Sequence, residues 1–111
     1  MSEVTLVPVG RDAQDLRFFI RLDGRHAGGI TVHSVSGDSF SYGIAVAREV
    51  RRRGAARGAL PQLYAQMKAR GFSRAVVRIQ ASNRASLALH EGLGFIEAGR
   101  ADGVVTLEKM L

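Results

Sequence analysis

The period at which apolar residues recur changes at Gly54. Before Gly54, runs rich in β-branched and aromatic residues occupy 4–9, 18–35 and 38–47, a pattern typical of strands. Turn sequences at 23–24 and 36–38 interrupt these runs, which predicts an antiparallel meander. After Gly54 the spacing becomes three and four, which predicts an amphipathic helix. Its apolar face comprises Ala55, Ala56, Ala59, Leu60, Leu63, Tyr64 and Met67, and Gly71 is the expected stop.

The proline inside this helix should disturb it. Pro61 has no N–H to donate to the carbonyl four residues back, so we expect a kink or a division into two segments.

The remaining chain predicts one more strand, a second helix and a closing strand. Residues 75–80 are predicted as the strand, and Ser82 or Asn83 as the cap of a helix that runs through Leu93. Residues 104–111 are expected to close the sheet. This order predicts a mixed α/β or α+β fold, and 111 residues with 46% hydrophobic content suit a single domain over residues 1–111.

Composition excludes several kinds of site. The chain has no cysteine, and its three histidines, His26, His33 and His90, lack the spacing of metal ligands, so we expect neither a metal nor a thiol nucleophile. No apolar run approaches about 18 residues, which predicts a cytoplasmic protein without a membrane partner. The net charge of +6, carried mostly by arginine, favours an anionic ligand.

Positive charge gathers where the third run leads into the helix. Backbone N–H groups at a helix N-terminus bind anions, and the small residues Gly54, Ala55 and Ala56 would leave them accessible. Four arginines, Arg51, Arg52, Arg53 and Arg57, surround this turn. They could simply be solvated, but arginine at a helix N-terminus opposes the helix dipole, which favours a phosphorylated ligand instead.

Two segments carry a family resemblance. Residues 46–60, VAREVRRRGAARGAL, contain Arg51, Gly54 and Ala56 at the spacing of the acetyl-CoA signature of the GNAT superfamily of N-acetyltransferases. Residues 83–95, NRASLALHEGLGF, resemble that family's second signature. The chain is therefore identified as resembling a GNAT acetyltransferase.

The resemblance implies a mixed, mainly antiparallel sheet with two main helices, splayed between its fourth and fifth strands, with acetyl-CoA in the splay. It implies that backbone at Ile44, Ala45 and Val46 pairs with the pantetheine and that amides at 51–56 hold the pyrophosphate. Asn83 would bind the acetyl-CoA arm or cap the last helix, and Ser86 would join the same site.

The resemblance also implies chemistry by direct attack of an amine on the thioester. The amide near Val46 would polarise the thioester carbonyl. His90 stands where many relatives carry a tyrosine that protonates the departing thiolate; a structural role near the helix C-terminus is the alternative.

A general base is harder to assign. Arg78 and Ser41 occupy the positions where relatives carry a catalytic glutamate, and neither accepts a proton at neutral pH. Water, Glu49 or His33 remain as alternatives.

A further departure lies near the N-terminus. About eight residues separate the first two strands, too few for the two helices that wall the acceptor site in relatives. The resemblance thus implies an open acceptor side, and we expect a homodimer that covers it.

Three functions follow in order of preference. The first is transfer of an acetyl group from acetyl-CoA to a primary amine. The second is a non-catalytic module that binds acyl-CoA as a sensor or partner subunit. Nucleic-acid binding ranks last because two tyrosines and no tryptophan offer little stacking surface.

Overall fold

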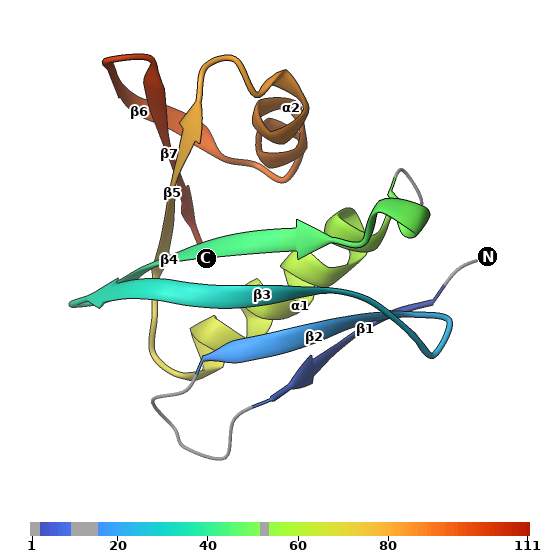
Figure 1. Cartoon of the computed structure of the whole chain (residues 1–111). Coiled ribbons are helices and arrows are strands. Elements are labelled where there is room, and N and C mark those ends of the chain that lie inside the picture. Colours follow the sequence, from blue (N-terminus) through green and yellow to red (C-terminus); the bar gives the residue numbers. More distant parts are fainter. Residues whose placement is uncertain (1–2, 10–15, 52–53) are drawn as a thin grey trace.

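One sheet dominates the fold (Figure 1). The computed structural model of the chain describes residues 3–9, 16–51 and 54–111. Within these residues, seven strands lie in the order β1-β2-β3-β4-β5-β7-β6, and every neighbouring pair is antiparallel except β4 and β5. This confirms the predicted mixed, mainly antiparallel sheet. The strands are β1 (Val4–Pro8), β2 (Arg17–Leu22), β3 (Arg25–Ser36), β4 (Ser39–Val46), β5 (Arg74–Gln80), β6 (Ile96–Ala101) and β7 (Val104–Met110).

The parallel pair β4 and β5 separates soon after it starts. The two strands pair only at Ser39 with Arg74 and at Phe40 with Ala75. Beyond these positions they run apart, with α2 (Arg84–Gly92) beside β5, as Figure 1 shows. The sheet is therefore splayed between its fourth and fifth strands, as predicted.

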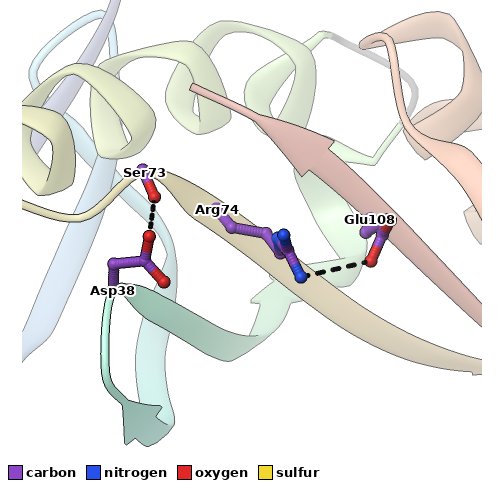
Figure 2. Close-up of polar contacts among 4 residues, drawn as sticks. All are labelled: Asp38, Ser73, Arg74 and Glu108. Carbon is purple, nitrogen blue, oxygen red and sulfur yellow. Dashed lines mark hydrogen bonds and ion pairs between the residues drawn. The ribbon is translucent and has the colours of Figure 1, made fainter.

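Polar contacts hold the closed end of the splay (Figure 2). The Ser73 hydroxyl donates to the Asp38 carboxylate, and this bond holds the pKa of that carboxyl below its usual range. The N–H groups of Ser73 and Arg74 both donate to the Asp38 carbonyl, at 2.8 and 3.2 Å. An ion pair of 3.9 Å joins Arg74 to Glu108 on β7. The contacts of Asp38 with Ser73 and Arg74 fix where β4 and β5 begin to diverge, and the ion pair ties β5 to β7.

The helix α1 (Ala55–Ala69) packs against β1, β2 and β4. It buries Ala55, Ala59, Leu60, Leu63, Tyr64 and Met67, which are six of the seven residues predicted for its apolar face. The seventh, Ala56, is half-buried. The helix ends at Ala69 with Arg70 as its cap, and Gly71 follows with a left-handed φ of 99°, as the sequence predicted. A short 3₁₀ helix, η1 (Arg48–Val50), links β4 to this region.

Of the two outcomes predicted at Pro61, a kink or a division of the helix, the division is wrong. α1 is one helix of 15 residues with Pro61 inside it. Pro61 lies on the exposed face, where water can serve the carbonyl of Arg57 that lacks its usual donor. The tertiary contacts of the buried face then keep both halves in one helix.

A strand that the sequence analysis missed precedes the closing strand. β6 pairs antiparallel with β7 and forms the far edge of the sheet. At the other end, the eight residues 9–16 join β1 to β2, and 10–15 of them, where the two helices were expected to be missing, lie outside the described residues. Among the described residues, none of the helices has the length and hydrophobicity of a membrane span.

Candidate active site

A cavity of about 880 Å³ lies where the end of β4, the start of α1 and one side of α2 meet. It gathers most of the residues predicted for acetyl-CoA, namely Ile44, Ala45, Val46, Arg51, Gly54, Ala55, Ala56, Arg57, Asn83 and Ser86. Arg52 and Arg53 lie outside the described residues. Val50, Ala85, Ala88 and Leu89 complete the lining, so the walls away from the arginines are apolar.

The β4 wall of this cavity has an open backbone edge. On one side β4 pairs with β3 along its whole length, and Gly28 lies opposite Val46. On the other side the pairing with β5 stops at Phe40, so residues 44–46 border the cavity instead of another strand. An extended ligand could pair with this edge as an added strand would.

Gly28 supports that edge from behind. A Cβ at Gly28 would lie 2.1 Å from the Ala45 carbonyl oxygen, closer than any real contact. Any larger residue would therefore displace β4 where it borders the cavity.

The start of α1 offers hydrogen-bond donors. Its cap, Gly54, has a left-handed φ of 81° and no side chain that could bond the first turn. The first intrahelical bond runs from the Gly58 N–H to the Gly54 carbonyl, at 2.9 Å. The N–H groups of residues 55–57 precede that bond, and together with the helix dipole they suit a phosphate.

Arginines flank these donors. The Arg51 Nε donates to the Val46 carbonyl at 3.3 Å, which holds its guanidinium beside the end of β4. Arg57 lines the cavity as well, and its Nη2 would lie 3.5 Å from a Cβ placed at Gly92 on α2. Positive charge thus borders the cavity beside the end of β4 and in the first turn of α1.

Asn83 caps α2. Its Oδ1 accepts from the Ser86 N–H at 3.2 Å, which agrees with the capping role that the sequence left open. Both residues also border the cavity. Binding of the acetyl-CoA arm by Asn83 remains a prediction.

His90 is buried, with 2% of its surface exposed. Its Nδ1 lies 2.8 Å from the Ser86 carbonyl, which can only accept, so Nδ1 carries the proton. Its Nε2 then accepts from the Tyr42 hydroxyl at 3.0 Å, and the Tyr42 oxygen lies 2.5 Å from the Tyr64 hydroxyl. Both ring nitrogens are therefore engaged inside the protein.

Burial governs the protonation of this cluster. Burial lowers the pKa of His90 and so favours the neutral imidazole. The hydrogen bond to the Ser86 backbone raises this pKa, but its effect is smaller. Burial also raises the pKa of Tyr42 and of Tyr64. A neutral His90 with no nitrogen facing the cavity favours the structural role over the proton donor.

The candidate base His33 lies in a different place, together with the two residues that stand where relatives carry a glutamate. His33, Ser41 and Arg78 line a second cavity of about 580 Å³ between β4 and β5, on the side of the closed end of the splay. Glu49, in η1, is exposed and lines neither cavity.

The comparison with protein families agrees with this geometry. The model described as the Acetyltransferase (GNAT) family matches residues 5–95. The chain belongs to the GNAT family of acetyltransferases. Curated relatives of this GNAT chain include the ribosomal protein bS18-alanine N-acetyltransferases of Escherichia coli K12 and Salmonella typhimurium LT2. They are 32% and 34% identical to it over 83 residues, which is 75% of this chain and 56% of each relative. The match thus spans little more than half the length of these proteins.

Solved structures show the same GNAT fold. The ribosomal-protein-S18-alanine N-acetyltransferase from Escherichia coli superposes with a TM-score of 0.77 at 22% identity, over 99% of this chain and 94% of that one. The IAA acetyltransferase from Bacillus cereus ATCC 14579 superposes with a TM-score of 0.80 at 15% identity, over the full length of both chains.

Sequence reasoning missed three residues that shape the site, Gly28, Tyr42 and Tyr64. The glycine pair 28–29 inside a strand pattern was an available signal, because glycine in a strand often marks a close backbone approach. Nothing local in the sequence pairs Tyr42 with His90, which lie 48 positions apart.

Proposed function

We propose that this GNAT chain is an N-acetyltransferase that uses acetyl-CoA and a primary amine. One observation carries the proposal: the open edge of β4 and the uncapped, arginine-flanked start of α1 border the same cavity. A strand edge next to a phosphate-binding turn matches the chemistry of acetyl-CoA. Its extended pantetheine arm could pair with the edge, and the pyrophosphate at the end of that arm could bind the turn.

The proposed binding assigns a task to each wall. The N–H groups of residues 55–57 and the guanidinium groups of Arg51 and Arg57 would hold the phosphates. The edge at 44–46 would align the arm, and the Val46 amide would polarise the thioester carbonyl. The apolar walls at Ala88 and Leu89 would exclude water from the arm.

Transfer would proceed by direct attack. The amine nitrogen bonds to the carbonyl carbon, the C–S bond breaks, and the proton that the nitrogen loses balances the one that the thiolate gains. An alkyl thiol has a pKa of about 8.5, so the thiolate is a moderate leaving group that solvent can protonate. The protein then contributes mainly alignment and charge stabilisation.

The acceptor proposed here is a primary amine because the named relatives acetylate an alanine of a ribosomal protein. The test is an assay that follows both products. Purified protein should release free CoA thiol from acetyl-CoA only when an amine is present, and mass spectrometry should find one acetyl group added to that amine. Thiol release without amine, or no acetylated amine across a broad set of small amines and peptides, would contradict the proposal.

One observation favours the second candidate, a non-catalytic module that binds acyl-CoA. No carboxylate lines either cavity among the described residues, since Arg78 and Ser41 replace the glutamates expected from relatives. Acetyl-CoA binding with no transfer to any amine would select this candidate.

We also propose a homodimer. Only eight residues, 9–16, separate β1 from β2, where relatives carry the helices that wall the acceptor site, and Phe19 on β2 is 44% exposed. Apolar side chains left at the surface commonly mark a subunit contact. Light scattering that finds a monomer at micromolar concentration, with and without CoA, would contradict it.

A further inference from the structure

The second cavity adjoins the first on β4. Gly43 lines the cavity of about 580 Å³, and the next residue, Ile44, lines the other one. Alternate residues of β4 face this cavity, and they are Ser39, Ser41 and Gly43. On β5 the corresponding residues are Val76 and Arg78. The side chains of Phe40 and Tyr42 point to the buried side with α1. The two cavities therefore border neighbouring residues of β4.

A bulge turns His33 toward this cavity. Val32 lies opposite Tyr42 and Ser34 opposite Ser41, so His33 is the extra residue of β3. β-Bulges re-aim side chains and occur often beside active sites. A Cβ at Gly43 would lie 2.5 Å from His33 Nε2, so the imidazole occupies the space that a side chain on β4 would fill.

The lining is basic and rich in hydroxyl groups. It includes the imidazole of His33, the guanidinium of Arg78 and serines at 36, 39 and 41, and none of the described residues that line it is a carboxylate. Arg78 is exposed on β5 opposite Thr106. In the described part of the chain, no hydrogen bond or ion pair engages its guanidinium, whereas Arg74 on the same face of β5 is paired with Glu108. A free guanidinium in a hydroxyl-lined cavity suits a carboxylate ligand.

We propose that this cavity holds the acceptor and selects amines that carry a carboxylate close to the amine, as α-amino acids do, with Arg78 as the carboxylate-binding residue. This inference rests on the proposed function. The positive charge of Arg78 also disfavours the ammonium form of the acceptor and so favours the neutral amine that attacks. The same charge disfavours polycationic acceptors.

Binding of product analogues tests the inference without turnover. The probes are the N-acetyl derivatives of alanine, phenylalanine and glutamine, each as the free acid and as the amide, titrated calorimetrically into protein saturated with CoA. Wild type should bind at least one free acid about tenfold or more tightly than its amide. Arg78→Gln should abolish this preference, and Arg78→Glu should reverse it. Arg74→Gln is the matched control, because it removes an arginine from the same strand and face outside the cavity lining and should keep the preference.

Kinetics then separate this inference from the proposed function. If the free amino acids are acetylated in preference to their amides and Arg78→Gln removes the preference, both proposals stand. If no amine is acetylated but the acids still bind through Arg78, the cavity inference stands and the enzyme proposal fails. If the acids bind no better than the amides, the inference is overturned whatever the turnover.

Discussion

At the scale of single residues, His90 shows how burial decides between two roles that a sequence leaves open. Its position matches a family motif, but its ring donates to the Ser86 carbonyl and accepts from Tyr42 inside the core. The hydrogen-bond chain from Tyr64 through Tyr42 to His90 joins α1, β4 and α2. We therefore interpret His90 as the residue that fixes α2 against the sheet beside the cavity.

This role predicts a specific pH dependence of stability. Burial lowers the pKa of His90 in the folded protein below the ordinary value of 6.5. Below that value the unfolded chain binds a proton that the folded chain does not, so the contribution of His90 is complete above about pH 6.5 and is lost as the pH falls. Denaturant unfolding at a series of pH values should show this loss between pH 7 and 5. His90→Phe should remove most of it while costing about 1 to 3 kcal/mol at pH 7.

The control and the kinetics of the same variant complete this test. The exposed His26, replaced as His26→Gln, should leave the loss of stability unchanged. At saturating acetyl-CoA, folded His90→Phe should keep kcat within about tenfold of wild type, because general acid catalysis contributes about 10²-fold or more. A larger drop in kcat with the fold intact would restore His90 as the proton donor.

Individual site residues were predictable where the signal was local. The turn from β4 into α1 combines glycine, small residues and arginines within 51–57, and the described members of this set do line one cavity. Tyr42 and Gly43 were not predictable, because each is explained by a partner distant in sequence, His90 and His33. At Gly28 the glycine pair signalled a close backbone approach but did not identify its partner, Ala45.

At the scale of elements, α1 is tied to the edge strand β1 by one side chain and one glycine. Gln62 Nε2 donates to the Val4 carbonyl at 2.7 Å, and Gln62 Oε1 accepts from the Leu6 N–H at 3.1 Å. Gly58 allows the approach, since a Cβ there would lie 2.7 Å from Val4 Cγ2 and 2.8 Å from Val4 Cβ. The contact between these two elements therefore depends on a residue without a side chain.

The close contact between Gly58 and Val4 should reverse the usual effect of replacing glycine by alanine inside a helix. Alanine is favoured over glycine inside a helix by about 1 kcal/mol, but Gly58→Ala should lower the free energy of unfolding by about 1 to 3 kcal/mol because the stiff Val4 side chain must move. Gly92→Ala in α2 is the matched control, since its Cβ would meet only Arg57 Nη2 at an ordinary 3.5 Å. It should leave stability unchanged or raise it. A stabilised Gly58→Ala in chemical denaturation would contradict the packing described here.

The missed strand β6 shows why some elements escape a pattern-based prediction. All six of its residues are exposed, so it carries no alternation of buried and solvated positions. Its turn was nevertheless visible in the sequence. Asp102 and Gly103 have φ of 53° and 76°, the same left-handed pair that Asp23 and Gly24 form between β2 and β3. An Asp-Gly pair predicts a hairpin even when one of its strands has no buried face.

At the scale of the whole molecule, the splay of the sheet brings the two cavities together. It begins where the Asp38 contacts end, and it leaves the edge of β4 free for a ligand. Local patterns predicted both strands but not that they diverge. Their divergence depends on pairing between segments that are distant in the sequence. The family resemblance supplied that expectation, and the register of β4 with β5 bears it out.

The most direct test of this account is the binding of acetyl-CoA to the start of α1. Thermal unfolding of the wild type, Gly54→Asp and Gly54→Asn should be compared with and without acetyl-CoA. Asparagine matches aspartate in size and also tolerates the left-handed backbone, so the two variants differ mainly in charge. Ligand at about 100 times its dissociation constant should stabilise the wild type by about 2.7 kcal/mol, a shift of several degrees in Tm. The account predicts that Gly54→Asp loses this shift while Gly54→Asn retains much of it. The absence of a shift in the wild type at millimolar acetyl-CoA, or equal shifts in both variants, would contradict it.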